Sequence, residues 1–208
     1  MQNTRDQDLF TTNINQNLRL EGTHVILEAM TMDHIEGLNK AADDGELWKL
    51  KVTSVPRAKD MKTVVQKAIT QGEKGQQVPF VVRRKHDGDV VGSTRFYNIS
   101  ARNRNLSIGY TWYSQSVHRT AINTECKLLL LSHAFEKAAC ISVQWHTHHE
   151  NTKSQKAILR LGAKLEGVLR NHQILDDGRI RHTHCFSMLD EEWPASKLFL
   201  QQRLAAHA

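Results

Sequence analysis

Residues 106–139 read LSIGYTWYSQSVHRTAINTECKLLLLSHAFEKAA and combine a strand, a short loop and a long helix. In the first eight residues, large apolar side chains recur at every second position: Leu106, Ile108, Tyr110 and Trp112. This period of two is typical of a strand. From Ala121 to Ala139 the chain is apolar over most of a helical circumference, so we expect a long helix that is largely buried. The polar segment 114–120 connects the two.

The end of this loop has the features of an anion site. A helix that begins after a tight turn presents unpaired N–H groups and the positive end of its dipole. These groups attract a phosphate. His118 and Arg119 add basic side chains, and the small Ala121 lets a diphosphate approach the backbone. Many helices begin this way and bind nothing, so the loop alone does not decide between the two interpretations.

The sequence on either side predicts one α+β domain over residues 18–208. Residues 1–17 are polar and without a clear period, and we expect them to form a flexible N-terminal arm. Seven strands are predicted by alternation and turn residues, near 25–29, 78–83, 90–99, 106–113, 140–147, 163–174 and 180–189. Helices are predicted near 35–42, 60–71, 121–139 and 151–161, followed by a short C-terminal helix that opens at Trp193-Pro194.

Composition excludes several classes of protein. Of the 208 residues, 39% are hydrophobic and 24% are charged, which is typical of a globular chain and not of a disordered or collagen-like one. No apolar run approaches the ~18–20 residues that span a bilayer. No secretory signal is visible, so we expect a cytoplasmic protein without membrane contact. The three cysteines lack a paired spacing, which argues against a disulfide framework or a cysteine-based zinc site.

The chain is basic. There are 28 Lys and Arg against 22 Asp and Glu, a formal net charge of +6. This excess favours an anionic partner, either nucleic acid, an acidic protein or a phosphate-bearing cofactor. The basic residues are scattered, so a mixed solvated surface is preferred to a nucleic-acid-binding patch.

The order of elements and several motifs resemble the GNAT superfamily of N-acetyltransferases. The six residues 118–123, HRTAIN, stand where that family has its pyrophosphate loop, Gln/Arg-x-x-Gly-x-Gly/Ala, with His, Ala and Asn in place of Gln/Arg and the two glycines. The segment NTKSQKAILRLGAKLEGVLRNH, 151–172, is similar to the ribosomal-protein N-terminal (alanine/serine) acetyltransferase branch. DDGRIRHTHCFSML, 176–189, and EEWP, 191–194, continue this likeness, which covers about residues 18–195.

The resemblance implies a fold and a co-substrate. It implies a mixed, mostly antiparallel central sheet of about seven strands flanked by helices, with the fourth and fifth strands splayed apart. Acetyl-CoA would insert between these strands, with its pantetheine paired to backbone groups near Trp112 and Tyr113. Its pyrophosphate would lie on the loop and helix start, made by His118, Arg119, Thr120, Ala121, Ile122 and Asn123. Asn151 and Ser154 would lie close to the thioester.

Attack of an amine on a thioester needs positioning, an oxyanion donor and a route for the proton. A backbone N–H at a bulge of the fourth strand is the expected oxyanion donor. Ser154 is expected to assist the leaving thiolate, because the tyrosine that many members use falls at Ile158 here. A hydroxyl that satisfies the first helical turn is the alternative role for Ser154. Asn151 is expected to cap the helix and to contact the cofactor as well.

Several residues are candidates for the general base. Histidine titrates near neutral pH, which favours His172. Gln173 lies beside it, Glu166 is a candidate by residue type, and water alone is a further alternative. Trp48 is expected either to line the acceptor pocket or to pack in the core.

Twelve histidines are present, and two clusters, HTHH at 146–149 and HTH at 182–184, place alternate imidazoles on single strand faces. Four such side chains together suit zinc or copper. We expect no metal site, because no carboxylate or cysteine pairing completes one. A smaller alternative is that one of these histidines serves the acceptor amine.

The sequence therefore predicts an acetyl-CoA-dependent N-acetyltransferase, and both a monomer and a homodimer are compatible with it. Its acceptor would be a primary amine, on either a protein N-terminus or a small molecule. A catalytically silent CoA-binding module and a basic nucleic-acid-binding protein are the rival functions.

Overall fold

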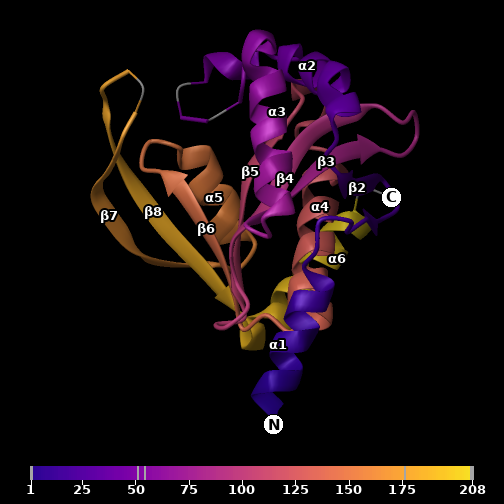
Figure 1. Ribbon diagram of the computed structural model, residues 1–208, viewed down its shortest axis with the longest axis vertical. Coiled ribbons are helices and arrows are strands. Elements are labelled where there is room, and N and C mark those ends of the chain that lie inside the picture. The colour runs from indigo at the N-terminus through magenta and orange to yellow at the C-terminus, as the bar shows by residue number, and fades with distance from the viewer. Residues whose placement is uncertain (1, 51, 54, 176, 207–208) are drawn as a thin grey trace.

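The computed structural model describes residues 2–50, 52–53, 55–175 and 177–206. Within them a single sheet contains eight strands in the order β1-β2-β3-β4-β5-β6-β8-β7 (Figure 1). Its members are β1 (Leu20–Glu21), β2 (Val25–Ala29), β3 (Gln77–Arg84), β4 (Val90–Ser100), β5 (Asn105–Tyr113), β6 (Ser142–His148), β7 (Lys164–Ile174) and β8 (Ile180–Leu189). Every neighbouring pair is antiparallel except β5 and β6, which run parallel.

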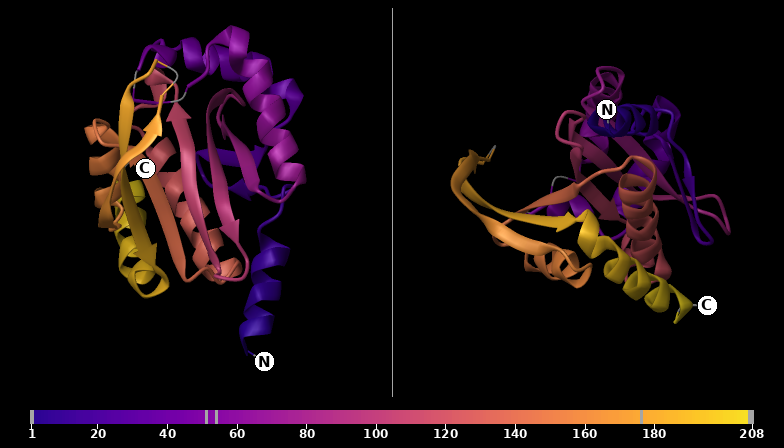
Figure 2. Two further views of the ribbon diagram at one scale, coloured as in Figure 1. Left: turned by 60° about the vertical axis from the view of Figure 1, so that its left-hand side comes forward. Right: turned by 90° about the horizontal axis from the view of Figure 1, so that it is seen from below.

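Helices cover both faces of this sheet (Figures 1 and 2). They are α1 (Gln2–Asn13), α2 (Ile35–Asp43), α3 (Ala58–Glu73), α4 (Ala121–Ser132), α5 (Thr152–Arg160) and α6 (Trp193–Ala205). Alternation along β3 shows the two layers: Val78, Phe80 and Val82 join a core with α4 and α6, while Val81 faces α2 and α3. No helix in the described part of the chain is long and apolar enough to cross a membrane.

The predicted fold class is confirmed. All seven predicted strands occur, and the eighth is the two-residue β1. The helix predicted over 121–139 is α4 followed by a single π turn, His133–Lys137. Cys126 and Cys140 are buried, and burial raises the pKa of each thiol to about 12, so neither is a reactive thiolate near neutral pH.

The flexible arm expected over residues 1–17 contains a helix that the sequence did not predict, α1 at residues 2–13. Long-range contacts hold this helix. Phe10 is fully buried in the core beside α4, and Asp6 accepts from Arg104 Nη1 at 2.6 Å. The helix has one apolar anchor and no amphipathic stripe, so periodicity could not reveal it.

The sheet opens between β5 and β6. These strands pair only through residues 105–107 of β5 and 142–144 of β6. Beyond Ser107, β5 keeps β4 as its strand partner, and a bulge places Tyr110 at φ 51°. The predicted splay between the fourth and fifth strands is therefore present, between the elements labelled β5 and β6.

The sheet ends in a long hairpin of β7 and β8, which curves away from the rest of the molecule (Figure 2). Side chains of β7 are exposed along nearly its whole length. β8 lies between β7 and β6, so the hairpin continues the sheet beyond the opening.

Glu125 ties α4 to the start of β2. The side chain is 5% exposed, and its two oxygens accept from three consecutive backbone N–H groups, of Thr23 at 2.7 Å, His24 at 2.7 Å and Val25 at 2.8 Å. A carboxylate that accepts several N–H groups makes strong, charge-assisted bonds. This contact fixes the position of the helix whose N-terminus borders the opening in the sheet.

Glu125→Ala leaves three N–H groups without their acceptor, and each buried donor costs ~1–3 kcal/mol. We expect a loss of about 3 kcal/mol or more in the free energy of unfolding, which lowers Tm by about 6–12 °C in a chain of this size. Thermal unfolding followed by circular dichroism measures it. Glu73→Ala, at the exposed end of α3, is the control and should move Tm by less than ~2 °C. Equal Tm values for the two variants would show that the Glu125 contact contributes nothing.

Candidate functional site

A cleft of about 420 Å³ occupies the opening between β5 and β6. Three elements supply most of its wall. The bulged end of β5 contributes residues 108–113, β6 contributes residues 145–148, and the start of α5 contributes Asn151 and Ser154. Because the two strands no longer pair here, their facing main-chain groups need other partners, and a ligand in extended conformation can supply them.

Trp112 and Tyr113 lie on this open stretch of β5. Their strand partners are Ser93 and Gly92 of β4, and both residues line the cleft. The edge of β5 that faces β6 is free of strand pairing beyond Ser107 in the described structure. The structure thus brings these two predicted residues into the cleft.

The loop after β5 leads to α4 through a 3₁₀ turn, Gln115–Val117. Arg119 adopts φ 65°, a left-handed conformation that costs a non-glycine residue about 1–2 kcal/mol. Thr120 caps α4: its hydroxyl donates to Val117 O at 2.7 Å and accepts from Ile122 N at 3.4 Å. The His118 ring donates through Nε2 to Tyr113 O at 3.0 Å, so this side chain holds the loop rather than facing the helix end.

A second hollow, of about 260 Å³, lies at the N-terminus of α4. Arg119, Arg160 and Arg203 converge on it from three elements. Asn123, Ala157 and Leu161 line both this hollow and the cleft, so the two are adjacent. Three guanidinium groups beside a helix N-terminus favour a polyanion. The side chains of Ala121 and Ile122 are buried, so only their backbone groups are available to a ligand.

Asn151 is the predicted cap of α5. Its Oδ1 accepts from Ser154 N at 3.0 Å, and its Nδ2 donates to Val52 O at 3.4 Å. The cap places the Ser154 side chain in the first turn, where it lines the cleft. Sequence spacing was sufficient to predict the cap and the position of Ser154, because the Asn151–Ser154 contact lies within one helical turn. It could not predict the contact with Val52, which is 99 residues away in the chain.

Trp145, which lines the cleft, has an unpaired donor. The residue is only 3% exposed, and its indole Nε1 is buried without a hydrogen-bond partner among the described residues. A buried donor of this kind usually has a partner. The amide and carbonyl oxygens of a pantetheine chain are suitable acceptors, so the cleft fits the co-substrate that the sequence implied.

The histidines do not all lie where the sequence suggested. His146 and His148 line the cleft, whereas His172 lies on β7 in an open hollow beside His182. His172 Nδ1 contacts Thr183 Oγ1 at 3.0 Å. The structure therefore does not place His172 among the residues that line the cleft with Asn151 and Ser154.

His146 is a better placed base. Its Nδ1 lies 3.3 Å from the Tyr97 hydroxyl, and burial lowers the pKa of the imidazole below its usual value. Burial also raises the pKa of Tyr97 to about 12, so the phenol stays neutral. A neutral imidazole in a partly dry cleft can accept a proton.

Other residues singled out from the sequence lie outside the cleft. Glu166 accepts a hydrogen bond from the Ser187 hydroxyl, and Gln173 is exposed on β7. Trp48 stacks against the cations of Lys49 and Arg57, at 5.2 and 5.0 Å from its ring centroid. None of the three lines the cleft.

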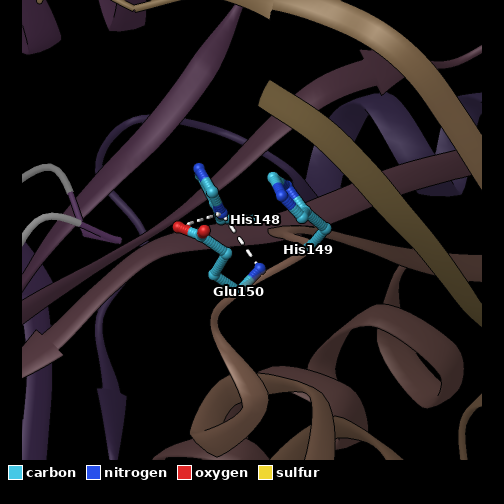
Figure 3. Close-up of side chains that lie close together, drawn as sticks. All are labelled: His148, His149 and Glu150. Carbon is cyan, nitrogen blue, oxygen red and sulfur yellow. Dashed lines mark hydrogen bonds and ion pairs between the residues drawn. The ribbon is translucent and has the colours of Figure 1, made fainter. Parts of the chain in front are cut away.

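A different histidine group gathers at the end of β6 (Figure 3). Donor atoms of His148, His149 and Glu150 lie within 4.8 Å of one another, and His149 packs on His182 with ring centroids 4.7 Å apart. The Nδ1 atoms are engaged: that of His148 accepts from Glu150 N at 3.0 Å, and that of His149 lies 3.2 Å from His182 N. A metal ion would compete with these contacts, and the absence of a required metal stays a prediction.

Lys127 is a residue of the cleft that was not predicted from the sequence. It is 7% exposed on α4, it lines the cleft, and its Nζ donates to Thr111 Oγ1 at 3.3 Å. Burial lowers the pKa of the amine to about 8. The sequence did hold a signal, a lysine directly before four leucines in a helix expected to be buried.

Comparisons with known proteins agree with this geometry. Residues 24–164 match the family described as "Acetyltransferase (GNAT) domain". A crystal structure of a provisionally assigned acetyltransferase is 31% identical, covers 89% of this chain and 93% of its own, and superposes with a TM-score of 0.79. A GCN5-related N-acetyltransferase from Brucella melitensis is 28% identical, covers 90% of this chain and 86% of its own, and has a TM-score of 0.80.

A more distant structure is RimJ from Mycobacterium smegmatis in complex with CoA-disulfide. It is 22% identical, covers 88% of each chain and has a TM-score of 0.71, which shows a shared fold alone. None of the curated proteins compared matches the chain.

Lys127→Met should stabilise the protein most at neutral pH. The folded-state pKa of about 8 lies below the ordinary 10.5, so below pH 8 the folded protein carries a poorly solvated charge. Between about pH 8 and 10.5 only the unfolded chain keeps this proton, and the stability of the wild type rises with pH. The Tm advantage of Lys127→Met is therefore expected at pH 7 and should shrink by pH 10.

Thermal unfolding at several pH values measures this difference. Lys62→Met, at an exposed position of α3, is the matched control and should show no such trend. A Tm difference between Lys127→Met and wild type that is independent of pH would show that the Lys127 amine is not destabilised by burial.

Proposed function

Given that the chain belongs to the GNAT acetyltransferase family, the acetyl-CoA-dependent acyltransferases, we propose that its acceptor is a primary amine that meets the thioester in the cleft between β5 and β6. One observation carries the proposal. At the bulge of β5, the cleft brings together open strand edges, the Ser154 hydroxyl and an imidazole with a lowered pKa, that of His146. These are the groups that acyl transfer to an amine requires.

The residues that would hold acetyl-CoA line the cleft and the adjacent hollow at the N-terminus of α4. Backbone N–H groups at the start of α4, from Arg119 to Asn123, would bind the pyrophosphate. The Ile122 N–H is already shared with Thr120, so its neighbours would supply the remaining bonds. The guanidinium groups of Arg119, Arg160 and Arg203 would balance the phosphate charge. Main-chain groups of Trp112 and Tyr113 would pair with the pantetheine.

Acetyl-CoA, when bound, supplies an activated acetyl thioester. The chain would contribute three functions around it. The bulge at Tyr110 interrupts the regular pairing of β5 with β4. A main-chain N–H of this stretch would stabilise developing negative charge on the carbonyl oxygen. Ser154, placed by the Asn151 cap, would donate a hydrogen bond to the departing sulfur. Asn151 would hold the first turn of α5, which carries Ser154, in this orientation.

His146 would take the proton from the amine. The tautomer with Nδ1–H directed to the Tyr97 oxygen leaves Nε2 free to accept it. His148 is less suited, because its Nδ1 accepts a backbone N–H and Nε2 therefore carries the proton. His172 is the alternative base that the sequence favoured, and direct transfer to water is another.

The acceptor itself is either a protein N-terminus or a small-molecule amine. The likeness of residues 151–172 to the ribosomal-protein N-terminal acetyltransferases favours the first. The limited volume of the cleft is compatible with the second. A silent CoA-binding module is the rival function, and the departures of the loop 118–123 from the family pattern support it.

Release of free thiol from acetyl-CoA in the presence of amines and N-terminal peptides tests the enzyme against the silent module. Ser154→Ala should lower kcat by at least about tenfold, because leaving-group assistance is worth ~10²–10⁴ in rate. CoA affinity, measured by calorimetry, should be nearly unchanged. Thr152→Ala is the matched control, since it removes a hydroxyl from the exposed position at the start of the same helix. Wild-type kcat in Ser154→Ala would restrict this serine to a structural role.

The pH profile distinguishes the two histidines. A base with a lowered pKa is neutral at pH 7 and loses activity only as the pH falls through that value, below about 6.5. His146→Gln should lower kcat by about 10²-fold at pH 7.5 and remove the acid limb of the profile. His172→Gln should keep the wild-type kcat at pH 7.5 and the acid limb of the profile. The reverse pattern would assign the base to His172, and an acid limb kept by both variants would favour water.

A further inference from the structure

A third cavity, of about 250 Å³, lies on the other side of β5, beneath α2 and α3. It is distinct from the cleft between β5 and β6 and from the hollow at the N-terminus of α4. Its wall is mostly apolar and includes Met30, Leu38, Met61, Val64 and Val65. Tyr110 and Trp112 line both this cavity and the cleft, so the two meet at the bulge where the thioester is expected.

Two charged residues line this cavity, the exposed Lys67 of α3 and the buried Arg95. Arg95, on β4, is only 7% exposed. Its Nη1 donates to Gln77 Oε1 at 3.0 Å, and its guanidinium carbon lies 4.5 Å from the centre of the Tyr110 ring. Its Nε is buried without a hydrogen-bond partner, and Arg95 makes no ion pair within the described part of the chain.

This arrangement is costly. A buried charge normally has an opposite charge beside it, and an unpaired one is strongly destabilising. Arginine keeps its proton in proteins, so it cannot escape the cost by becoming neutral. Gln77 does not relieve it, because its amide offers one oxygen and is itself bound to Gln71. The guanidinium fork has donors left over, and a planar carboxylate matches them.

We propose that this cavity binds the carboxylate and apolar body of the acceptor, so that the substrate is a small amine that also carries a carboxylate. The inference rests on the proposed function and deepens it. The volume of the cavity equals that of about eight water molecules at ~30 Å³ each, which is sufficient for a short aliphatic acid. A peptide N-terminus has a neutral carbonyl in place of the carboxylate, so the proposal favours small molecules over proteins.

The test compares pairs of amine acceptors that differ only in having a carboxylate or a neutral carboxamide. Thiol release from acetyl-CoA is measured with apolar α-amino acids and with ω-amino acids of increasing length, each beside its carboxamide. Wild type should prefer at least one acid over its amide by tenfold or more in kcat/KM. Arg95→Met should abolish this preference, and Arg95→Lys should weaken it. Arg57→Met, an exposed arginine before α3, should leave it unchanged.

Binding without catalysis provides a second readout. Pentanoate, but not pentanamide, should raise the Tm of wild type, and Arg95→Met should lose this shift. The variant is expected to fold with a Tm at or above that of wild type, because removing an unpaired buried charge is neutral or stabilising. A pentanoate shift that persists in Arg95→Met would overturn the proposal.

The outcomes separate the two levels of inference. Acetylation of amines with no preference for the acid in wild type would overturn the Arg95 site and leave the proposed function intact. A pentanoate shift that depends on Arg95, without acetylation of any amine, would support the carboxylate site and contradict the proposed function.

Discussion

The parallel pairing of β5 and β6 stops after three residues on each strand, and the rest of the site depends on this limit. Every strand has two edges of N–H and C=O groups, and buried main-chain groups need partners. Along the open stretch of β5, β4 satisfies one edge only. The other edge therefore faces a cavity instead of a strand, and an extended polar ligand completes the sheet there.

Several contacts keep this opening in place. The Glu125 carboxylate fixes α4 to the backbone at the start of β2, so the N-terminus of this helix stays beside the end of β5. The His118 ring binds the carbonyl of Tyr113 and thereby fixes the loop between them. On the far side, Asn151 caps α5 and reaches Val52 across the cleft. The cleft is thus bounded by side-chain to main-chain bonds, which hold it open without strand pairing.

The sequence predicted the parts of the structure that depend on near neighbours. The seven strands, the α5 cap at Asn151 and the placement of Ser154 all follow from periodicity or from contacts within one turn. Arg95, Lys127 and α1 were missed for the opposite reason. Burial of Arg95 depends on α3, burial of Lys127 on β5, and α1 on contacts about 100 residues away. His172 was favoured because an imidazole titrates near neutral pH, whereas the path of its hairpin decides which histidines reach the cleft.

Arg95 and Lys127 lie on opposite sides of the same strand pair. On β4, Thr94 turns toward Thr111, which contacts Lys127, while its neighbour Arg95 turns toward α3. Each cation is buried with neutral partners alone in the described structure, and burial lowers the pKa of both. Natural chains rarely keep such costs without a function, since most single substitutions to an apolar residue would remove them. The bulge at Tyr110 lies between the two, in a backbone conformation that is also unfavourable. Two uncompensated positive charges beside a strained segment would favour anionic groups on both sides of the bulge, and acetyl transfer between a polyphosphate donor and an acidic acceptor would use both.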